Sequence, residues 1–421
     1  MIIHKLQLTG LKSFEHAEFN FKPGMNLLVG INGVGKTTTL DALRVCLSSL
    51  LPNITSSRSQ KIRFDTSDIR VGYDAIDVVC DFQLHKRNFT LLLHKQRYKN
   101  VENEPGNVRA QTIYTPDLEE FSPALSGLSP TGKDSTRQPL GIFFSTRRSL
   151  IVDQKASPHS AAGGQAAAYS ESLSPNREFN LRIIAQWFKV QEELGEENPV
   201  AIRHIRALKK AVSLFLPDFK NLRVMEVDGN LNLVIEKKKI PLPVSQLSDG
   251  ERGVLSMVLD LARRLSQANP ALPNPVRDGI AVVLIDELDL HLHPIWQRSI
   301  VEKLTMTFRN CQFIATTHSP QIIPSVEPER IQLLENNEVI TPDKSLGMDS
   351  NWILRHLMET GDRPEASEAA IQQVEKLMNK GNFKAARTAM AKYTDSGLDL
   401  SEWAIFEARM ARLESFDEDD D

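Results

Sequence analysis

The stretch MNLLVGINGVGKT, residues 25–37, decides the fold of this chain. It begins with a short apolar run that predicts a buried strand, and residues 38–50 after it predict a helix with one apolar stripe. Its last eight residues match the pattern GxxxxGK[ST] in full, and a strand before and a helix after are the context that this pattern requires. The alternative is a chance glycine-rich turn before a helix. The pattern in its context predicts a phosphate-binding loop.

The residues of this loop are expected to hold the phosphates of a nucleotide. Glycines let the backbone curl around phosphate, while successive N–H groups and the helix N-terminus supply positive charge. Lys36 is expected to bridge the β- and γ-phosphates as a catalytic residue, and the Thr37 hydroxyl to ligate Mg²⁺. The expected cofactors are therefore ATP and Mg²⁺. The predicted nucleotide-binding residues here are Gly30, Asn32, Gly33, Gly35, Lys36, Thr37 and Thr38.

Two more apolar runs end in polar side chains. The run AVVLIDE, residues 281–287, predicts a strand that is buried on both faces, as in a parallel sheet whose carboxyl edge binds ligands. We expect Asp286 to hold Mg²⁺ and Glu287 to polarise the attacking water as general base. The run QFIATT, residues 312–317, leads to His318, which we expect to reach the γ-phosphate. The alternatives are a solvated acidic strand end and an ordinary histidine.

A third motif, LSDGER at residues 247–252, precedes an apolar-striped helix. By itself it is a good helix start, with Ser248 or Asp249 as the N-cap. Together with the other motifs, LSDGE resembles the LSxGE signature of the ATP-binding-cassette ATPases. The resemblance implies that Ser248, Gly250 and Glu251 contact the γ-phosphate of ATP held by a second subunit. It therefore implies a homodimer or higher homo-oligomer with ATP between its heads.

The order of the motifs favours one branch of that superfamily. Residues 2–43, DELDLHLHPIWQ (286–297) and FIATTHSPQII (313–323) resemble the compact RecF- and OLD-like ATPases. Among these the chain most resembles PtuA, the ATPase of the Septu anti-phage system, which implies an HNH nuclease partner. Residues 349–416 lack the Toprim pattern of OLD nucleases. Two alternatives stay open, a RecF-like DNA repair or recombination ATPase without a nuclease partner and a soluble ATPase subunit of a membrane transporter.

The predicted fold is an α/β ABC-type P-loop ATPase head, with a doubly wound, mostly parallel sheet and antiparallel N-terminal strands. A helical insertion and a helical C-terminal domain complete it. The expected divisions are 1–95, the N-terminal part of the head; 96–243, an insertion with a flexible loop at about 157–175, helices and a hairpin; 244–345, the C-terminal part of the head; 349–416, a helical domain that docks the partner; and 417–421, an acidic tail.

Composition limits the class of protein. The 421 residues are 41% hydrophobic and 25% charged with a net charge of -4, as in soluble proteins of two or three domains. Three distant cysteines exclude a disulfide framework and a cysteine zinc site. The N-terminus lacks a signal peptide pattern and no apolar run is long enough to cross a bilayer, so a cytoplasmic protein with no membrane partner is expected.

Two basic stretches could contact DNA through its phosphates, and a solvated face is the alternative. One comprises His85, Lys86, Arg87, Lys95, Arg97 and Lys99, and the other comprises Arg203, Arg206 and Lys210 at helical spacing. The glutamine loop of the ABC-type superfamily has three candidates in this sequence, Gln60, Gln83 and Gln138.

Overall fold

The apolar runs that precede the phosphate loop, Asp286 and His318 become neighbouring strands of one six-stranded sheet. Its order is β15-β14-β3-β13-β12-β6. The first five strands along the chain are parallel, and only the edge strand β15 is antiparallel, to β14. The sheet comprises β3 (Met25–Val29), β6 (Leu140–Phe144), β12 (Ala281–Ile285), β13 (Cys311–Thr316), β14 (Ile331–Glu335) and β15 (Glu338–Ile340). Every residue of β3, β6, β12 and β13 is buried, as expected for strands that are covered on both faces.

The computed structural model describes residues 1–84, 86–97, 137–149, 151–152, 164–177, 179–227, 230–335, 337–358, 360 and 363–418. The chain divides into two units, residues 1–353, which we call the head, and residues 354–421, which we call the helical unit. Within the described ranges, no helix has both the length and the apolar character needed to cross a membrane.

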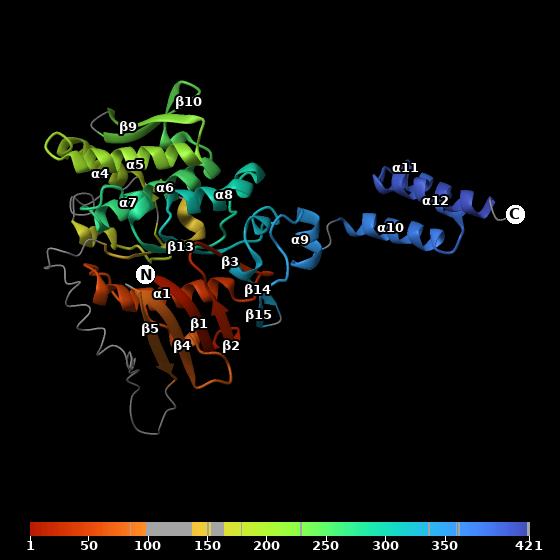
Figure 1. Cartoon of the computed structure of the whole chain (residues 1–421), viewed down its shortest axis with the longest axis horizontal. Helices are drawn as coiled ribbons and strands as arrows, with labels where there is room; N and C mark the ends of the chain where they lie inside the picture. Colours follow the sequence, from red (N-terminus) through yellow and green to blue (C-terminus); the bar gives the residue numbers. More distant parts are fainter. Residues whose placement is uncertain are drawn as a thin grey trace. The chain divides into compact units, whose positions relative to one another are not determined.

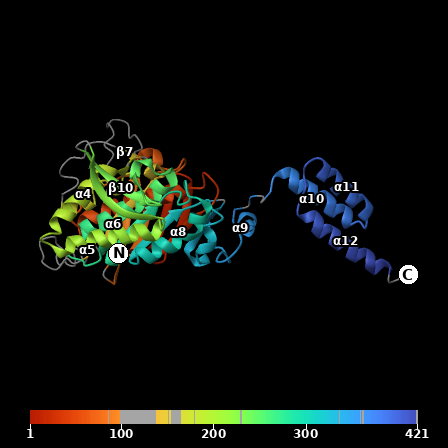
Figure 2. The same cartoon turned by 90° about the horizontal axis from the view of Figure 1, so that it is seen from above.

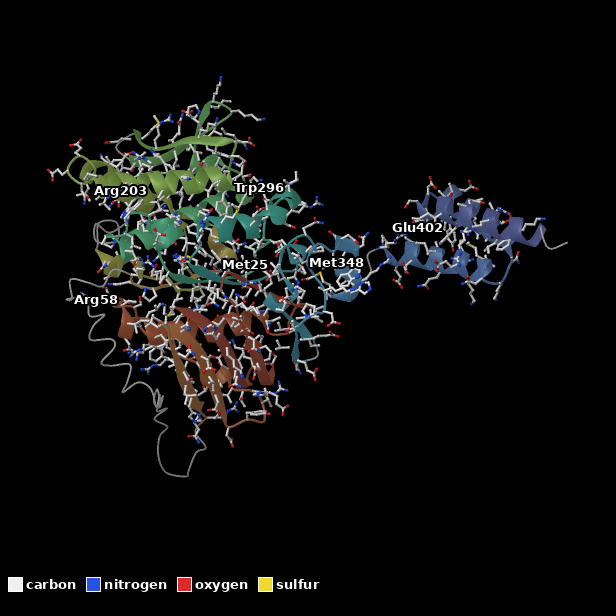
Figure 3. The ribbon with its side chains drawn as sticks, in the orientation of Figure 1. Met25, Arg58, Arg203, Trp296, Met348 and Glu402 are labelled. Carbon is white, nitrogen blue, oxygen red and sulfur yellow. The ribbon has the colours of Figure 1, made fainter. Side chains whose placement is uncertain are left out.

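Helices cover the two faces of the six-stranded sheet. Helix α1 (Lys36–Ile54) packs on β6, β12 and β13, and α6 (Asp249–Ala268) packs on β6. Figure 1 shows α1 and α6 on opposite sides of the sheet, with α4 (Leu181–Leu194) and α5 (Pro199–Phe215) beyond α6. The remaining helices of the head are α7 (Pro275–Asp278), α8 (Pro294–Thr307) and α9 (Ser350–His356), which crosses the boundary to the helical unit. Met25, at the start of β3, lies inside the head (Figure 3).

A second sheet, on the α1 side of the head, is antiparallel throughout, as the sequence predicts. Its order is β2-β1-β4-β5, from β1 (Ile2–Leu11), β2 (Phe14–Asn20), β4 (Ala75–Leu84) and β5 (Arg87–Gln96). The Gln312 side chain joins the two sheets, because its Oε1 accepts from Ile3 N at 2.8 Å and its Nε2 donates to Ile3 O at 2.7 Å. The doubly wound, mostly parallel sheet with antiparallel N-terminal strands is thus confirmed.

The insertion differs from expectation in two places. Leu140–Phe144, expected within the insertion, is the edge strand β6 of the head sheet and pairs with β12. Residues 164–175, expected to be a flexible loop, pack on α6 because Tyr169 is buried and its hydroxyl donates to the Pro139 carbonyl at 3.1 Å. Residues 157–163 of that loop lie outside the described residues.

Smaller elements complete the head. Strands β9 (Phe219–Val227), β10 (Asn230–Lys237) and β11 (Ile240–Pro243) form an antiparallel sheet, whose hairpin turn at 228–229 lies outside the described residues. Strands β7 (Ile151–Val152) and β8 (Phe179–Asn180) form a short parallel pair. The 3-10 helices are η1 (Thr66–Asp68), η2 (Thr146–Ser149), η3 (Gln165–Ala168), η4 (Val244–Gln246), η5 (Ile323–Ser325) and η6 (Pro328–Arg330).

The helical unit has a core of its own. It contains α10 (Glu365–Met378), α11 (Phe383–Asp395) and α12 (Glu402–Glu418), which lie alongside one another in Figure 2. Apolar side chains from all three helices, among them Val374, Met390 and Met410, are buried against each other. On the surface, Arg387 of α11 pairs with Glu407 at 3.0 Å and Glu414 at 2.8 Å. Of the predicted acidic tail, residues 419–421 lie outside the described residues.

Candidate nucleotide site

The predicted phosphate loop connects β3 to α1 as a curled backbone segment. Gly35, the N-cap of α1, has φ 107°, and a Cβ at this position would lie 2.4 Å from the Phe14 ring. Only glycine meets both constraints at low cost. Inside the curl, Lys36 Nζ donates to Gly30 O at 2.8 Å and to Ile31 O at 2.6 Å. The loop therefore surrounds an ammonium group at the N-terminus of a helix, where anions bind well.

The charge on Lys36 sits in a partly desolvated position. Burial lowers its pKa, while the nearby carboxylates of Asp286, Glu287 and Asp289 partly offset this effect. The ammonium therefore lies within reach of the acidic groups that follow β12. Of the other predicted residues, Asn32 and Gly33 are exposed and Thr38 is half-buried in the first turn of α1.

Thr37 and Asp286 come together at the carboxyl edge of the sheet, with Thr37 Oγ1 3.4 Å from Asp286 Oδ2. A hydroxyl and a carboxylate are hard oxygen donors, the ligands that Mg²⁺ prefers alongside water and phosphate. Among the described residues, no group of three or more His, Cys, Asp or Glu could hold a metal ion. The pair therefore fits Mg²⁺ as it is bound in nucleotide sites, where substrate phosphates supply further ligands.

Thr316, which the sequence analysis did not single out, holds both acidic residues in place. Its hydroxyl donates to Asp286 Oδ1 at 2.7 Å and accepts from Glu287 N at 2.7 Å. The backbone of Glu287 has φ 49°, a left-handed conformation that costs energy for a residue with a side chain. The signal in the sequence is a threonine that follows the apolar residues Phe313–Ala315 at the end of β13, which pairs in parallel with β12.

Arg148, on η2, is the second residue that the sequence analysis missed. It is buried, and its two terminal nitrogens donate to Asp286 O and Glu287 O, each at 2.6 Å. Its own carbonyl accepts from Ser256 Oγ of α6 at 3.0 Å. Burial lowers the pKa of Arg148 to about 10, and the carboxylates of Asp289, Asp286 and Glu287 oppose that shift. Arg148 thereby joins α6 to the loop that carries the predicted general base.

His318 lies beside the carboxylates of Asp286, Glu287 and Asp289, which we call the acidic cluster. Asp289 Oδ1 accepts from Thr317 Oγ1 at 2.6 Å and from His318 N at 3.2 Å, which fixes the turn after β13. The imidazole is half-buried, and burial lowers its pKa, with a further lowering from the positive charge of Lys36. At pH 7 this histidine is therefore mainly neutral.

The signature motif forms a capping box at the start of α6. Ser248 Oγ accepts from Glu251 N, and the Glu251 carboxylate accepts from Ser248 N at 3.1 Å and from Lys237 Nζ at 2.5 Å. Burial alone would raise the pKa of Glu251, but these hydrogen bonds outweigh it and the pKa is lowered. A Cβ at Gly250 would lie 2.4 Å from the His291 carbonyl oxygen, so this glycine allows α6 to meet the loop after β12.

The signature does not meet the phosphate loop within one chain. Over the part of the chain that the structure describes, no hydrogen bond or ion pair joins residues 248–251 to residues 30–38. Ser248 is instead exposed. The structure thus brings together the predicted residues Lys36, Thr37, Asp286, Glu287 and His318 at the sheet edge, while the signature contacts the loop after β12 through Gly250.

The predicted DNA-contacting and glutamine residues lie elsewhere. Arg203, Arg206 and Lys210 are all exposed on α5, where Figure 3 labels Arg203. Of the first basic stretch, His85 and Lys99 lie outside the described residues. The Gln138 side chain donates to Ser56 Oγ at 3.0 Å, and Gln83 donates to Asn88 at 3.2 Å on the antiparallel sheet. Neither of these two glutamines hydrogen-bonds to the sheet edge that carries the acidic cluster.

Comparison with known proteins finds relatives among bacterial proteins named as retron ATPases and Septu proteins. It is 27% identical to "Retron Ec83 probable ATPase" of Escherichia coli, over 85% of this chain and 76% of that relative. It is 26% identical to "Retron Vc95 probable ATPase" of Vibrio cholerae, over 93% of this chain and 86% of that relative. It is 22% identical to "Septu protein PtuA" of Bacillus thuringiensis, over 77% and 73% respectively. The resemblance to PtuA expected from the motifs is confirmed.

The family model described as "AAA domain, putative AbiEii toxin, Type IV TA system" matches residues 25–323. The match begins at β3 and ends just past His318, so it contains the phosphate loop, the signature, the acidic pair Asp286 and Glu287, and His318. Because it spans well over half of the chain, this protein belongs to that AAA-domain family and is a nucleotide-binding P-loop ATPase of it.

Proposed function

We propose that this chain binds ATP with Mg²⁺ between two paired heads and uses the nucleotide state to control a nuclease partner in anti-phage defence. The observation that carries the proposal is that, among the described residues, the signature at the start of α6 makes no hydrogen bond to the phosphate loop of its own head, and that its Ser248 is exposed. We take the phosphate loop with the acidic cluster as one half-site and the signature as the other. The names of the relatives, two retron ATPases and a Septu protein, support the defence context.

In this proposal the phosphate loop, the acidic cluster and His318 have separate roles. Lys36 leaves the loop carbonyls and pairs with the β- and γ-phosphates, while Thr37 and Asp286 hold Mg²⁺, which neutralises phosphate charge when bound. Glu287 orients the attacking water and accepts its proton, and neutral His318 donates a hydrogen bond to the γ-phosphate. Thr316 and Arg148 are positioning residues, because they contact the acidic residues rather than the nucleotide.

Exposed apolar side chains support pairing of the heads. Ile31, in the middle of the phosphate loop, is 60% exposed, and Ile295, at the start of α8, is 68% exposed. Both follow the carboxyl ends of sheet strands, the edge at which a second head would close over the nucleotide. Closure of a second head at this edge would remove both side chains from water, which is favourable.

The trans arrangement can be tested by complementation between two defective variants. Lys36→Ala removes the phosphate-binding lysine, and Ser248→Asn removes the signature hydroxyl while keeping a good helix cap. In a mixture of the two, half of the dimers contain one chain of each kind, and one of their two sites combines an intact loop with an intact signature. We expect each variant alone to be inactive and the mixture to regain up to about a quarter of wild-type ATPase turnover. Ser248→Thr, which keeps both hydroxyl and cap, is the control.

The outcomes separate the possible arrangements. If the mixture of the two variants is as inactive as each variant alone, the signature does not complete the site of a second head. It would then act at the phosphate loop of its own chain or outside the nucleotide site. Full turnover of Ser248→Asn alone would remove the signature serine from the mechanism. Formation of a dimer by Glu287→Gln with MgATP, measured by light scattering, is the expected companion result, because this variant should hold ATP without hydrolysing it.

We further propose that the helical unit docks the nuclease. It has a hydrophobic core of its own, built by α10, α11 and α12. When the protein is expressed together with its neighbouring genes, deleting residues 354–421 should abolish co-purification of an HNH nuclease and leave MgATP binding intact. Retained co-purification would place the interface on the head.

A further inference from the structure

A cavity of about 290 Å³ lies in the head behind the acidic cluster. We call it the arginine cavity. Its wall is formed by the end of β6, the turn η2 after it, η3, the first turn of α4 and the middle of α6. Four arginines line it: Arg148, Arg177, Arg263 and Arg264. Small-molecule sites begin at about this volume and are commonly built where several elements meet.

The positive charge in this cavity exceeds the negative charge. Asp260 of α6 is the buried carboxylate, and it accepts from Arg263 at 2.7 Å, from Arg264 at 3.0 Å and from Arg177. The other carboxylate on the wall, Glu171, is exposed to solvent. Among the residues that the structure describes on this wall, three guanidinium groups thus share one buried carboxylate, although Arg177 and Arg264 also donate to backbone carbonyls. Buried charges that lack a counter-charge are costly.

One donor among them has no partner at all. Arg263 is 4% exposed, and its Nε makes no hydrogen bond within the part of the chain that the structure describes. Its two terminal nitrogens bind Gln267 and Asp260 at 2.7 Å each, so the side chain is held in place with this N–H unsatisfied. Burial lowers the pKa of Arg177 to about 10, and the negative charge of Asp260 only partly offsets this lowering. The carboxylate therefore does not fully compensate the buried positive charge.

We propose that the arginine cavity binds a small soluble anion that carries one or two phosphate groups. Guanidinium groups present paired N–H donors that match phosphate oxygens, and a doubly charged anion would balance the excess charge. The cavity is separate from the phosphate loop, whose residues do not line it. This assignment does not depend on the function proposed above.

The position of the cavity makes its ligand an effector of the nucleotide site. Arg148 lines the cavity and also donates to the carbonyls of Asp286 and Glu287. Asp260 lies on α6, the helix that begins at the signature. An anion bound by these groups would therefore act on the general-base loop and on the signature helix at once, through contacts that already exist.

The test uses pyrophosphate as the probe and the full-length chain as the protein. Because the phosphate loop could also bind pyrophosphate, the titration is done in Lys36→Ala and, separately, in wild type saturated with Mg²⁺ and a non-hydrolysable ATP analogue. Calorimetry should detect one further site, and a concentration tenfold above Kd should raise Tm by about 2 °C. Sodium chloride at matched ionic strength is the control. Absence of binding in both formats would overturn the proposal.

A pair of variants at Ile183 gives a second, independent readout. Ile183 of α4 lines the cavity and is half-buried, so a longer polar side chain has room there. Ile183→Glu places a carboxylate among the arginines, whereas Ile183→Gln has nearly the same size without charge. The glutamate variant should have a Tm about 2 °C above that of the glutamine variant, and it should bind pyrophosphate at least about tenfold more weakly. A glutamate variant that melts below the glutamine variant would refute an uncompensated positive cavity.

Discussion

Replacing Thr316 by valine should weaken both the stability and the turnover of this protein. The exchange keeps the size and branching of a side chain that is 1% exposed, so it leaves no cavity. It removes the hydroxyl that donates to Asp286 and accepts from Glu287 N, both at 2.7 Å. The effect therefore isolates two hydrogen bonds at the acidic cluster.

The magnitude follows from the nature of these bonds. A hydrogen bond to a carboxylate contributes about 1.5 to 3 kcal/mol, and a buried N–H left without a partner costs about 1 to 3 kcal/mol. We expect the unfolding free energy to fall by about 3 kcal/mol, which for a head of this size lowers Tm by about 4 °C. Because the left-handed backbone of Glu287 loses its anchor, kcat should fall at least about tenfold while nucleotide Kd changes little.

A second buried threonine provides the matched control. Thr307, at the end of α8, is 7% exposed, and its hydroxyl has no hydrogen-bond partner in the described parts of the chain. Thr307→Val should therefore be neutral or slightly stabilising. Thermal unfolding and steady-state ATPase assays compare the two exchanges directly. If Thr316→Val and Thr307→Val have the same Tm and both hydrolyse ATP at the wild-type rate, the proposed anchoring by Thr316 is wrong.

Three further predictions follow from the same site. Lys36→Ala should weaken MgATP binding at least about 100-fold in equilibrium titrations, because it removes the cation at the centre of the loop. Gly250→Ala should cost about 1 to 3 kcal/mol in thermal unfolding, since the added methyl meets the His291 carbonyl at 2.4 Å. The folded-state pKa of His318 lies below its unfolded value, so its contribution to stability is lost as pH falls below about 6.5. NMR titration should show this pKa rising in Lys36→Met, and an unchanged value would refute the influence of that charge.

Local patterns in the sequence were sufficient to predict the phosphate loop and the acidic strand end. The loop follows from glycine spacing between a strand and a helix, and Asp286 and Glu287 follow from their place after a fully apolar run. Each of these two motifs consists of consecutive residues, so it can be recognised without knowledge of the tertiary structure. The antiparallel N-terminal sheet was predictable for the same reason, because alternation marks each strand by itself.

Residues that act across strands were not predictable in this way. Thr316 is important because β13 lies beside β12, and Arg148 because η2 returns to the end of the same strand. The edge strand Leu140–Phe144 escaped recognition because its five residues stand alone between polar stretches. Tyr169 sits among small polar residues, and only the tertiary structure shows that its buried ring fixes the segment 164–177 against α6.

Helix α6 carries residues of the signature, a contact to Arg148 and part of the wall of the arginine cavity. The signature lies at its N-terminus. About two turns later, Ser256 donates to the carbonyl of Arg148, which contacts the acidic loop. One turn further on, Asp260 pairs with the arginines of the cavity. A helix packed on this many sides moves as a body rather than bending at one contact. A displacement imposed at Ser248 by a second head would therefore shift the support of Glu287 and the arginine cavity together. A ligand bound in the cavity that opposes this movement of α6 must, by thermodynamic linkage, also change how readily two heads close around the nucleotide.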